Sequence, residues 1–266
     1  MKWAGGKSKL LAQLLPLLPP GVELRRHVEP FAGGAAVFFA LRPARALLCD
    51  VNPALVATYE AVRDDVAAVI AQLERLSRDH DERAYYHVRE RYNRARKLGA
   101  AERAATFIYL NKTCFNGLHR VNSKGEFNVP AGRYVNPRIL NEEALRAASA
   151  QLASCELRCT GFESLLSLAR PGDFVYLDPP YEPISETASF TAYAQNGFGR
   201  HDQMRLRDVF AALDRRGCRL MLSNSDAPFI LDLYRDFNID FVAAARAINS
   251  DAKKRGPVRE VVVRNY

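Results

Sequence analysis

Short apolar segments that alternate with helical patterns are the feature that most constrains how this chain of 266 residues can fold. Six of them have the length and composition of buried parallel strands, at residues 26–29, 46–50, 157–160, 174–178, 219–223 and 260–265. Helical patterns are clearest at residues 8–18, 34–41 and 202–216. This alternation predicts an α/β fold with a doubly wound sheet, whose ligands bind at the carboxyl ends of the strands.

The alternation stops after Asn52, and no convincing strand follows for roughly a hundred residues, too long a stretch for a crossover. Asn52 and Pro53 predict a helix start, with Asn as the cap and Pro in the first turn. An amphipathic face then runs through Val62, Val66, Val69, Ile70, Leu73 and Leu76. A second helix is expected at 101–111, and a polar loop at 112–138. We therefore expect a main domain of residues 1–54 and 145–266, and an inserted helical domain of residues 55–144.

The charge balance favours a polyanionic partner, because 38 Lys and Arg against 30 Asp and Glu give a net charge of +8, and basic side chains displace counterions from phosphates. The cysteines are scattered: Cys49, Cys114, Cys155, Cys159 and Cys218. No His lies at a matching spacing, so we predict neither a metal site nor disulfides. The apolar run 10–18 is too short to cross a bilayer, and no signal peptide is evident. We expect a soluble cytoplasmic protein.

The sequence Asp178-Pro179-Pro180-Tyr181 directly follows the apolar run 174–177. A strand there would set Asp178 at the carboxyl edge of the sheet, and the prolines would present their carbonyls outward as rigid acceptors. A carboxylate, a fixed carbonyl and an aromatic ring suit a planar base with an amino group, which would donate to Asp178 and to the Pro179 carbonyl. The same residues are good turn formers, and composition alone leaves both interpretations open.

Two glycine-containing segments are candidates for a cofactor site. Glu29-Pro30-Phe31-Ala32-Gly33-Gly34 joins a predicted strand to a helix, and Asp50 ends the next strand about 20 positions on, where an acidic residue often accepts from ribose hydroxyls. This pattern does not separate NAD from S-adenosylmethionine, but the absence of a full G-x-G-x-x-G fingerprint disfavours a dinucleotide. The opening Lys2-Trp3-Ala4-Gly5-Gly6-Lys7 suits adenine stacking and carboxylate pairing, or simply a capped helix start with a core anchor.

The segment from Asn111 to Arg133 interleaves aromatic side chains with Arg, Lys and Asn. Arg reads guanine, Asn reads adenine, and a ring fills a gap in a base stack. An ordinary solvated loop has a similar composition, so this pattern alone leaves both interpretations open.

These four elements occur together, and in this order, in the Dam-like (class alpha, D12) adenine-specific DNA methyltransferases, which the chain resembles over nearly its whole length. Residues 2–7, 29–33, 50–52 and 178–181 are similar to the opening, cofactor, acidic and catalytic motifs of that family. Residues 115–120, 125–130 and 132–134, with Phe190-Thr191-Ala192-Tyr193 and Gln203, resemble its GATC-recognising branch. The resemblance implies a Rossmann-like methyltransferase sheet with an inserted DNA target-recognition domain.

The resemblance also implies roles for individual residues. S-adenosylmethionine is expected to contact Trp3, Lys7, Glu29, Phe31, Gly33, Asp50 and Asp178. A flipped-out adenine would be held by Asp178, Pro179, Pro180 and Tyr181. The DNA would contact Lys2, Phe115, Asn116, Leu118, Arg120, Asn122, Pro130 and Arg133. Arg120 would read guanine, and Phe115, where relatives usually have Tyr, would fill the space that the base leaves. Ala35 stands where relatives often have a second glycine.

The resulting hypothesis is methyl transfer from S-adenosylmethionine to adenine N6 in double-stranded DNA, within GATC, by a bacterial or phage-encoded monomer. A restriction endonuclease of the same system is left open as a partner. The competing hypotheses are an N4-cytosine methyltransferase, which uses the same amine chemistry, and a non-catalytic DNA-binding protein of the same fold. A protein-glutamine methyltransferase would resemble Asn-Pro-Pro-Tyr, which Asp178 disfavours, and an NAD-dependent enzyme is favoured least.

Overall fold

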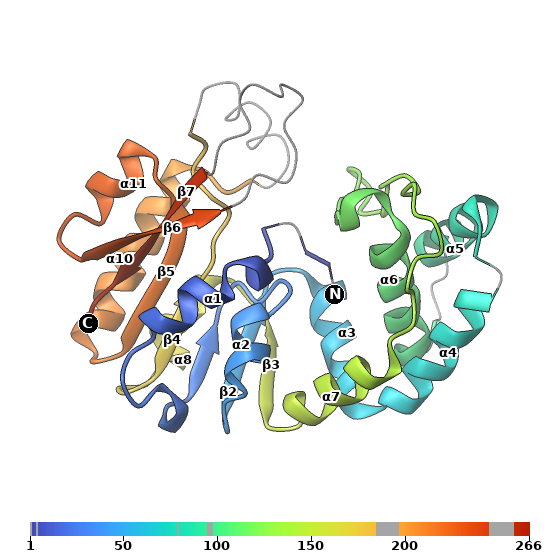
Figure 1. The fold of residues 1–266 in the computed structure, drawn as a ribbon, viewed down its shortest axis with the longest axis horizontal. Helices are drawn as coiled ribbons and strands as arrows, with labels where there is room; N and C mark the ends of the chain where they lie inside the picture. Colours follow the sequence, from blue (N-terminus) through green and yellow to red (C-terminus); the bar gives the residue numbers. More distant parts are fainter. Residues whose placement is uncertain (1, 4, 79, 95–97, 185–196, 245–257) are drawn as a thin grey trace. The chain divides into compact units, whose positions relative to one another are not determined.

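The computed structural model describes residues 1–266 except 1, 4, 79, 95–97, 185–196 and 245–257 (Figure 1). It forms two compact units. We call residues 7–49 with 160–266 the sheet unit, and residues 1–6 with 50–159 the helical unit. In the described part of the chain, no helix is both long and apolar enough to cross a membrane.

In the part of the chain that the structure describes, seven strands form one sheet in the order β3-β2-β1-β4-β5-β7-β6. Their bounds are β1 His27–Glu29, β2 Ala46–Asp50, β3 Cys155–Cys159, β4 Phe174–Leu177, β5 Arg219–Ser225, β6 Asn238–Ala244 and β7 Val258–Arg264. β1 pairs in parallel with β2 and with β4, and β4 pairs in parallel with β5. β7 is antiparallel to both of its neighbours. The predicted α/β class is confirmed, with a sheet that is mixed at one end.

The C-terminal end of the sheet differs from the expectation of six parallel strands. The predicted strand at 260–265 forms as β7, but it is antiparallel. β6 was not predicted, because Asp240 interrupts its apolar pattern. In the structure, Phe241 is half exposed whereas the next residue, Val242, is buried. Such alternation is what an edge strand requires, since less of its surface is buried than in a central strand.

Apolar side chains cover both faces of the sheet in the sheet unit, which explains why the central strands are continuous apolar runs. Val175 and Leu177 of β4 belong to one layer, with side chains from α8, α10 and α11. Phe174 and Tyr176 belong to the other layer, with side chains from α1 and α2. The helices are α1 Leu11–Leu14, α2 Ala36–Leu41, α8 Leu165–Leu168, α10 Arg200–Arg215 and α11 Pro228–Leu233.

The helix predicted at 8–18 is broken into three pieces. The short α1 lies between the 3-10 helices Lys7–Lys9 and Leu15–Leu17. Pro16 lies in the second of these 3-10 helices, and it has no N–H to continue an α-helical ladder. Lys7 begins the first 3-10 helix, next to the sheet edge described below.

In its described residues, the helical unit contains β3 and the α-helices α3 Pro53–Asp64, α4 Val66–Arg78, α5 Glu82–Arg94, α6 Ala100–Thr113 and α7 Glu142–Leu152. The predicted cap is confirmed, because Asn52 Oδ1 accepts from the backbone N–H groups of Ala54 and Leu55. The amphipathic face at 62–76 is shared by two helices, since the chain leaves helical geometry at Asp65. The Asp65 carboxylate then accepts from the Ala68 N–H at 3.0 Å and caps α4.

Candidate active site

Three acidic side chains come from the ends of three strands of the sheet unit, of which β1 and β4 are neighbours and β7 is separated from β4 by β5. Glu29 ends β1, Asp178 directly follows β4, and Glu260 lies near the start of the antiparallel β7. Because side chains alternate along a strand, Asp178 continues the face of Phe174 and Tyr176. An antiparallel strand begins where its parallel neighbours end, so all three acidic residues lie at the carboxyl edge of the parallel strands. This is the edge at which open α/β sheets bind ligands.

Lys7 is the cation that pairs with this acidic group. Its Nζ lies 2.8 Å from Asp178 Oδ1, with the Lys7 side chain 5% exposed and the Asp178 side chain 21% exposed. Burial raises the pKa of Asp178 to about 6, the negative charges of Glu260 and Glu29 act in the same direction, and Lys7 opposes them. The carboxylate is therefore ionised at neutral pH but becomes protonated well above the ordinary Asp pKa of about 3.9.

Tyr181 is fixed at both its hydroxyl and its ring. The hydroxyl donates to Glu260 Oε2 at 2.7 Å, and Lys7 Nζ lies 4.6 Å from the ring centroid. Burial raises the pKa of Tyr181 well above its ordinary value, and the charge of Asp178 adds to this. The hydroxyl therefore stays protonated and acts as a donor, which gives the ring one defined orientation.

Hydrogen bonds to α10 and β5 hold the segment after β4. Gln203 Nε2 donates to the Pro180 carbonyl at 2.8 Å, and Gln203 Oε1 accepts from Asn224 Nδ2 at 3.1 Å. Asn224 Oδ1 in turn accepts from the Glu182 N–H at 3.1 Å. The expectation that both proline carbonyls point outward is wrong for Pro180, because its carbonyl bonds to a buried amide. The role of amine acceptor stays a prediction for Pro179.

Glu29 is a structural anchor of the predicted cofactor loop. Its Oε1 accepts from the Phe38 N–H at 2.8 Å, in the first turn of α2, and lies 2.7 Å from His27 Nε2. A carboxylate is favourable there because the first N–H groups of a helix lack intrahelical partners and carry partial positive charge. Both Glu29 and His27 are buried. Glu29 thus sets where α2 begins, and its contact with a cofactor stays a prediction.

The turn between Glu29 and α2 has left-handed backbone at Gly33, with φ of 46°, and at Ala35, with φ of 49°. Glycine adopts this geometry freely, whereas alanine is strained in it. Phe31 packs in the same turn against the rings of Phe162 and Phe198, at centroid distances of 5.7 and 5.9 Å. Ala35, which stands where relatives often have glycine, is therefore a strained position, but the turn still forms.

The remaining predicted cofactor residues, Trp3 and Asp50, belong to the helical unit. Trp3 stacks on His119, with ring centroids 5.9 Å apart and 17° between the planes. Asp50 Oδ1 accepts from the Asn52 N–H at 2.9 Å. Lys2 is held next to Trp3 by Asn111, whose amide accepts from the Lys2 N–H at 2.9 Å and donates to the Lys2 carbonyl at 2.7 Å.

The predicted DNA-reading segment forms a loop after α6 and an irregular hairpin, with bridges at Cys114–Ala131 and Val121–Phe127. We call residues 115–134 the hairpin segment. Asn122 closes its tip, because Asn122 Oδ1 accepts from the N–H groups of Lys124 and Glu126 at 2.9 and 3.0 Å. The structure therefore gives Asn122 a turn-forming role, and its DNA contact stays a prediction.

Arg120 and Phe115, the two predicted DNA contacts with the most specific roles, are both accessible. Arg120 Nε donates to Asn128 Oδ1 at 2.8 Å, which holds the exposed guanidinium beside the hairpin. Phe115 is 50% exposed, and its N–H donates to the Pro130 carbonyl at 2.9 Å. Asn116 has left-handed backbone, with φ of 54°, and is followed by Leu118, whose N–H donates to the Phe115 carbonyl at 3.2 Å.

One face of α5 holds the hairpin segment by its backbone. Tyr85 and Arg89 both donate to the Val129 carbonyl, at 2.8 and 3.0 Å. Asn93 donates to the Phe127 carbonyl and accepts from the Phe127 N–H, both at 2.9 Å. These residues lie at i, i+4 and i+8, which places them along one side of a helix. None of these three residues was predicted from the sequence, although their spacing of four residues in a polar helical segment is a signal for one shared face.

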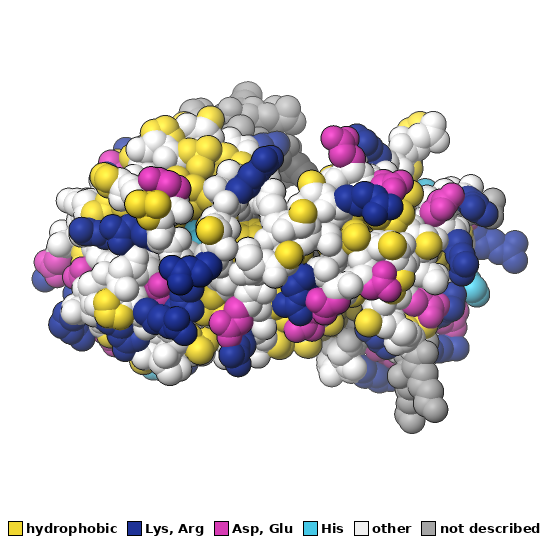
Figure 2. Space-filling view, turned by 90° about the horizontal axis from the view of Figure 1, so that it is seen from below, with side chains coloured by type: hydrophobic (Ala, Val, Ile, Leu, Met, Phe, Trp, Pro, Cys, Tyr) yellow, Lys and Arg dark blue, Asp and Glu magenta, His cyan; other side chains and the backbone are white. Residues whose placement is uncertain are grey.

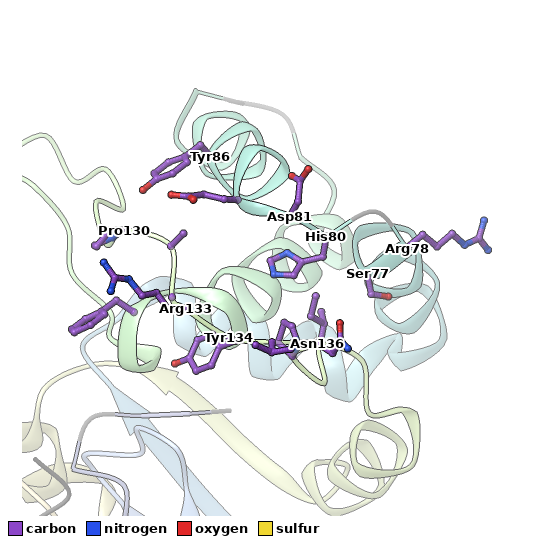
Figure 3. Close-up of a pocket in the computed structure, with 16 residues that line it drawn as sticks. Ser77, Arg78, His80, Asp81, Tyr86, Pro130, Arg133, Tyr134 and Asn136 are labelled. Atoms are coloured by element: carbon purple, nitrogen blue, oxygen red, sulfur yellow. The ribbon is translucent and has the colours of Figure 1, made fainter.

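A cavity of about 1190 Å³ lies between two stretches of the helical unit: the end of α4 with the start of α5, and the hairpin segment with residues 135–139 that follow it. In Figure 3, Tyr86 lies on the α5 side, and Pro130, Arg133 and Tyr134 lie on the other. Three predicted DNA contacts, Phe115, Pro130 and Arg133, line it together.

Glu260 and His119 are two further site residues to which the sequence did not assign a role. The signal for Glu260 is an acidic residue directly before an apolar run, and His119 lies inside the segment from Asn111 to Arg133. Residues 190–193 lie outside the described part.

Lys and Arg side chains are scattered among Asp and Glu on the face drawn in Figure 2, so the net positive charge does not gather there in one patch. Among the residues that the structure describes, no group of His, Cys, Asp and Glu side chains could hold a metal ion.

The seven-stranded sheet, with its acidic carboxyl edge, is that of a Rossmann-like methyltransferase. The profile of the D12 class N6 adenine-specific DNA methyltransferases matches residues 3–248, and the chain belongs to this family. It is 42% identical over 269 residues to the Type II methyltransferase M1.LlaDCHI of Lactococcus lactis subsp. cremoris, covering 100% of this chain and 94% of the relative. It is 35% identical over 266 residues to the DNA adenine methylase of Vibrio cholerae, covering 98% and 94%. The protein is a DNA adenine methyltransferase.

Proposed function

We propose that the protein transfers a methyl group from S-adenosylmethionine to N6 of an adenine flipped out of double-stranded DNA, within GATC. The observation that carries the proposal is the Asp178–Lys7 pair at 2.8 Å beside the anchored ring of Tyr181. An ionised carboxylate next to an oriented aromatic ring matches an amino group on a planar base. The GATC target is inferred from the likeness of the hairpin segment to the GATC-recognising branch.

The acidic edge fits a cationic methyl donor. Among the residues that the structure describes, Glu29, Asp178 and Glu260 bring three carboxylates to this edge and Lys7 brings one ammonium. The excess of negative charge in this described set favours a ligand with a sulfonium and an ammonium group. Lys7 is proposed to contact the carboxylate of that ligand. We propose that Trp3 stacks on its adenine and that Asp50 accepts hydrogen bonds from its ribose hydroxyls. When bound, S-adenosylmethionine supplies an activated methyl group, and the residues of the chain supply alignment.

Asp178 is proposed to make adenine N6 reactive. The lone pair of N6 is delocalised into the ring, so the amine is a poor nucleophile. When Asp178 and the Pro179 carbonyl accept its two hydrogens, the nitrogen becomes more pyramidal and its lone pair is freed. As the new N–C bond forms, the bond from the methyl carbon to the donor's sulfur would break and leave its electron pair on sulfur; N6 gains positive charge, which the Asp178 carboxylate stabilises. The proton then leaves N6 for solvent or for Asp178, whose raised pKa makes it a better acceptor than an ordinary Asp.

Residues 55–144 are proposed to read the DNA. Arg120, held by Asn128, would donate to a guanine edge in the major groove. Phe115, half exposed, would fill the space left by the flipped adenine and offset part of the few kcal/mol that flipping costs.

The proposal is tested on plasmid DNA from cells that express the protein. We expect N6-methyladenine, mapped by single-molecule sequencing to GATC and to no other four-base site. Asp178→Asn should reduce methylation by at least about 10²-fold, while the affinity for a GATC duplex stays within about threefold. Methylation at another sequence would contradict the target, and near-normal turnover of Asp178→Asn would contradict the role of the carboxylate.

A further inference from the structure

His119 contacts four segments of the helical unit. Its ring stacks on Trp3 at 5.9 Å and packs against Phe107 of α6 and Phe127 of the hairpin segment, at centroid distances of 5.5 and 5.8 Å. Its Nδ1 lies 3.3 Å from Asn52 Nδ2. The opening motif, Asn52 (two positions after the acidic strand end), α6 and the hairpin segment therefore meet at one imidazole.

The hydrogen bonds of Asn52 determine the protonation of this imidazole. Asn52 Oδ1 accepts from the N–H groups of Ala54 and Leu55 at 3.0 and 3.3 Å, so the amide nitrogen must face His119. An amide nitrogen only donates, which makes His119 Nδ1 the acceptor and puts the ring proton on Nε2. Burial lowers the pKa of His119, which agrees with a neutral ring.

Two neighbours of His119, one in space and one in the chain, have different tasks in the proposed function. Trp3 is a proposed cofactor contact, whereas Arg120, the next residue in the chain, is the proposed guanine reader. The opening motif is also docked on the loop, because a Cβ at Gly117 would lie 2.6 Å from Lys2 Cβ. A shift of the opening motif would therefore be transmitted to the loop by direct contact.

We propose that His119 couples cofactor binding to DNA reading. A cofactor that fixes Trp3 would favour the position of the hairpin segment in which Arg120 meets the DNA. By linkage, DNA would tighten cofactor binding by the same factor. This inference rests on the proposed function and adds a regulatory contact to it.

The test measures binding without turnover. Sinefungin, a non-transferring analogue of S-adenosylmethionine, is titrated by calorimetry into the full chain, alone and with a saturating GATC duplex. For the unaltered protein, we expect the duplex to tighten sinefungin binding about fivefold or more. His119→Leu removes the ring and the acceptor and should reduce the effect to within about twofold. His119→Phe keeps the stacked ring and should be intermediate, and His87→Leu, on the exposed side of α5, should behave as the unaltered protein.

The outcomes separate this inference from the proposed function. Failure of the unaltered protein to bind sinefungin and DNA would overturn both. Binding of each ligand without coupling, or full coupling in His119→Leu, would overturn only the role of His119. If His119→Leu does not fold, the pH dependence decides. The side chains packed on the ring (Trp3, Asn52, Phe107 and Phe127) do not titrate near neutrality. Acid should therefore weaken the coupling between cofactor and DNA in the unaltered protein by protonating Nδ1. In His119→Phe, the coupling should not show this loss at low pH.

Discussion

The Lys7 ammonium and the Asp178 carboxylate, 2.8 Å apart, join the first helical turn of the sheet unit to the end of its central β4. Lys7 is 5% exposed, and an ammonium buried to that extent is stable only with an anionic partner. Its charge is also the main influence that lowers the pKa of Asp178 against burial. Lys7 therefore keeps Asp178 ionised, besides its proposed contact with the cofactor.

Replacing Lys7 should shift the pH dependence of methylation. Only the ionised Asp178 carboxylate can stabilise the positive charge that develops on N6, so kcat/KM should fall as the pH drops through about 6, the pKa of its carboxyl. Lys7→Met removes the influence that lowers this pKa, and the acidic limb of the profile should move to higher pH. Lys9→Met, an exposed position of the same 3-10 helix, is the matched control. A limb that stays in place in Lys7→Met would contradict this electrostatic role.

Glu260 should have the opposite effect on the same profile. Its carboxylate accepts from the Tyr181 hydroxyl at 2.7 Å, and its charge helps to raise the pKa of Asp178 after the larger effect of burial. Glu260→Gln keeps an acceptor for Tyr181 but removes the charge, so the acidic limb should move to lower pH. Glu23→Gln, an exposed position of the same unit, is the control for charge alone.

The hydrogen bond between Tyr181 and Glu260 should appear as non-additivity. Tyr181→Phe keeps the stacking ring but frees its outer end, and we expect kcat to fall about tenfold, as for the loss of one hydrogen bond to a charged group. Combined with Glu260→Ala, Tyr181→Phe should cost little more than either change alone, because the two residues share one interaction. Fully additive losses in this double-mutant cycle would show that Glu260 does not orient the ring.

Sequence patterns predicted the parts of this protein whose causes are local. β2 has the predicted bounds, the cap at Asn52 forms as expected, and Asp178 follows β4 as its apolar run indicates. In each case, neighbouring residues determine the outcome, because apolar continuity sets a buried strand and an oxygen-bearing side chain sets a helix start.

Contacts between distant segments were not predictable in the same way. Glu260 is 79 positions from Tyr181, and Gln203 is 23 positions from Pro180. Neither distance corresponds to a helical or strand period, so only the assembled sheet shows that these side chains meet. The antiparallel direction of β7 depends on the order of the strands, which the alternation of apolar segments does not encode.

Arg120→Ala should relax specificity more than it weakens binding. The guanidinium is held by Asn128 Oδ1, so it is oriented before DNA arrives, and its loss should cost about 1–3 kcal/mol of discrimination at one guanine. The measurement is kcat/KM on duplexes with a single substitution at each position of GATC. Arg146→Ala, on the exposed side of α7, removes the same charge and should leave discrimination unchanged. A uniform loss across all duplexes would make Arg120 a phosphate contact instead.

Ala35 offers a test of backbone strain in the turn before α2. Its φ of 49° lies in the left-handed region, which costs a residue with a Cβ about 1–2 kcal/mol. Ala35→Gly removes that strain, but it adds chain entropy to the unfolded state and deletes a buried methyl, each worth roughly 0.5–1 kcal/mol. These terms nearly cancel, so the free energy of unfolding should change by less than about 1 kcal/mol.

Ala32→Gly, in the same turn, is also buried but lacks left-handed backbone. It suffers both losses without relief of strain and should be less stable than Ala35→Gly by about 1–2 kcal/mol in urea unfolding. Equal destabilisation of the two variants would mean that Ala35 is not strained.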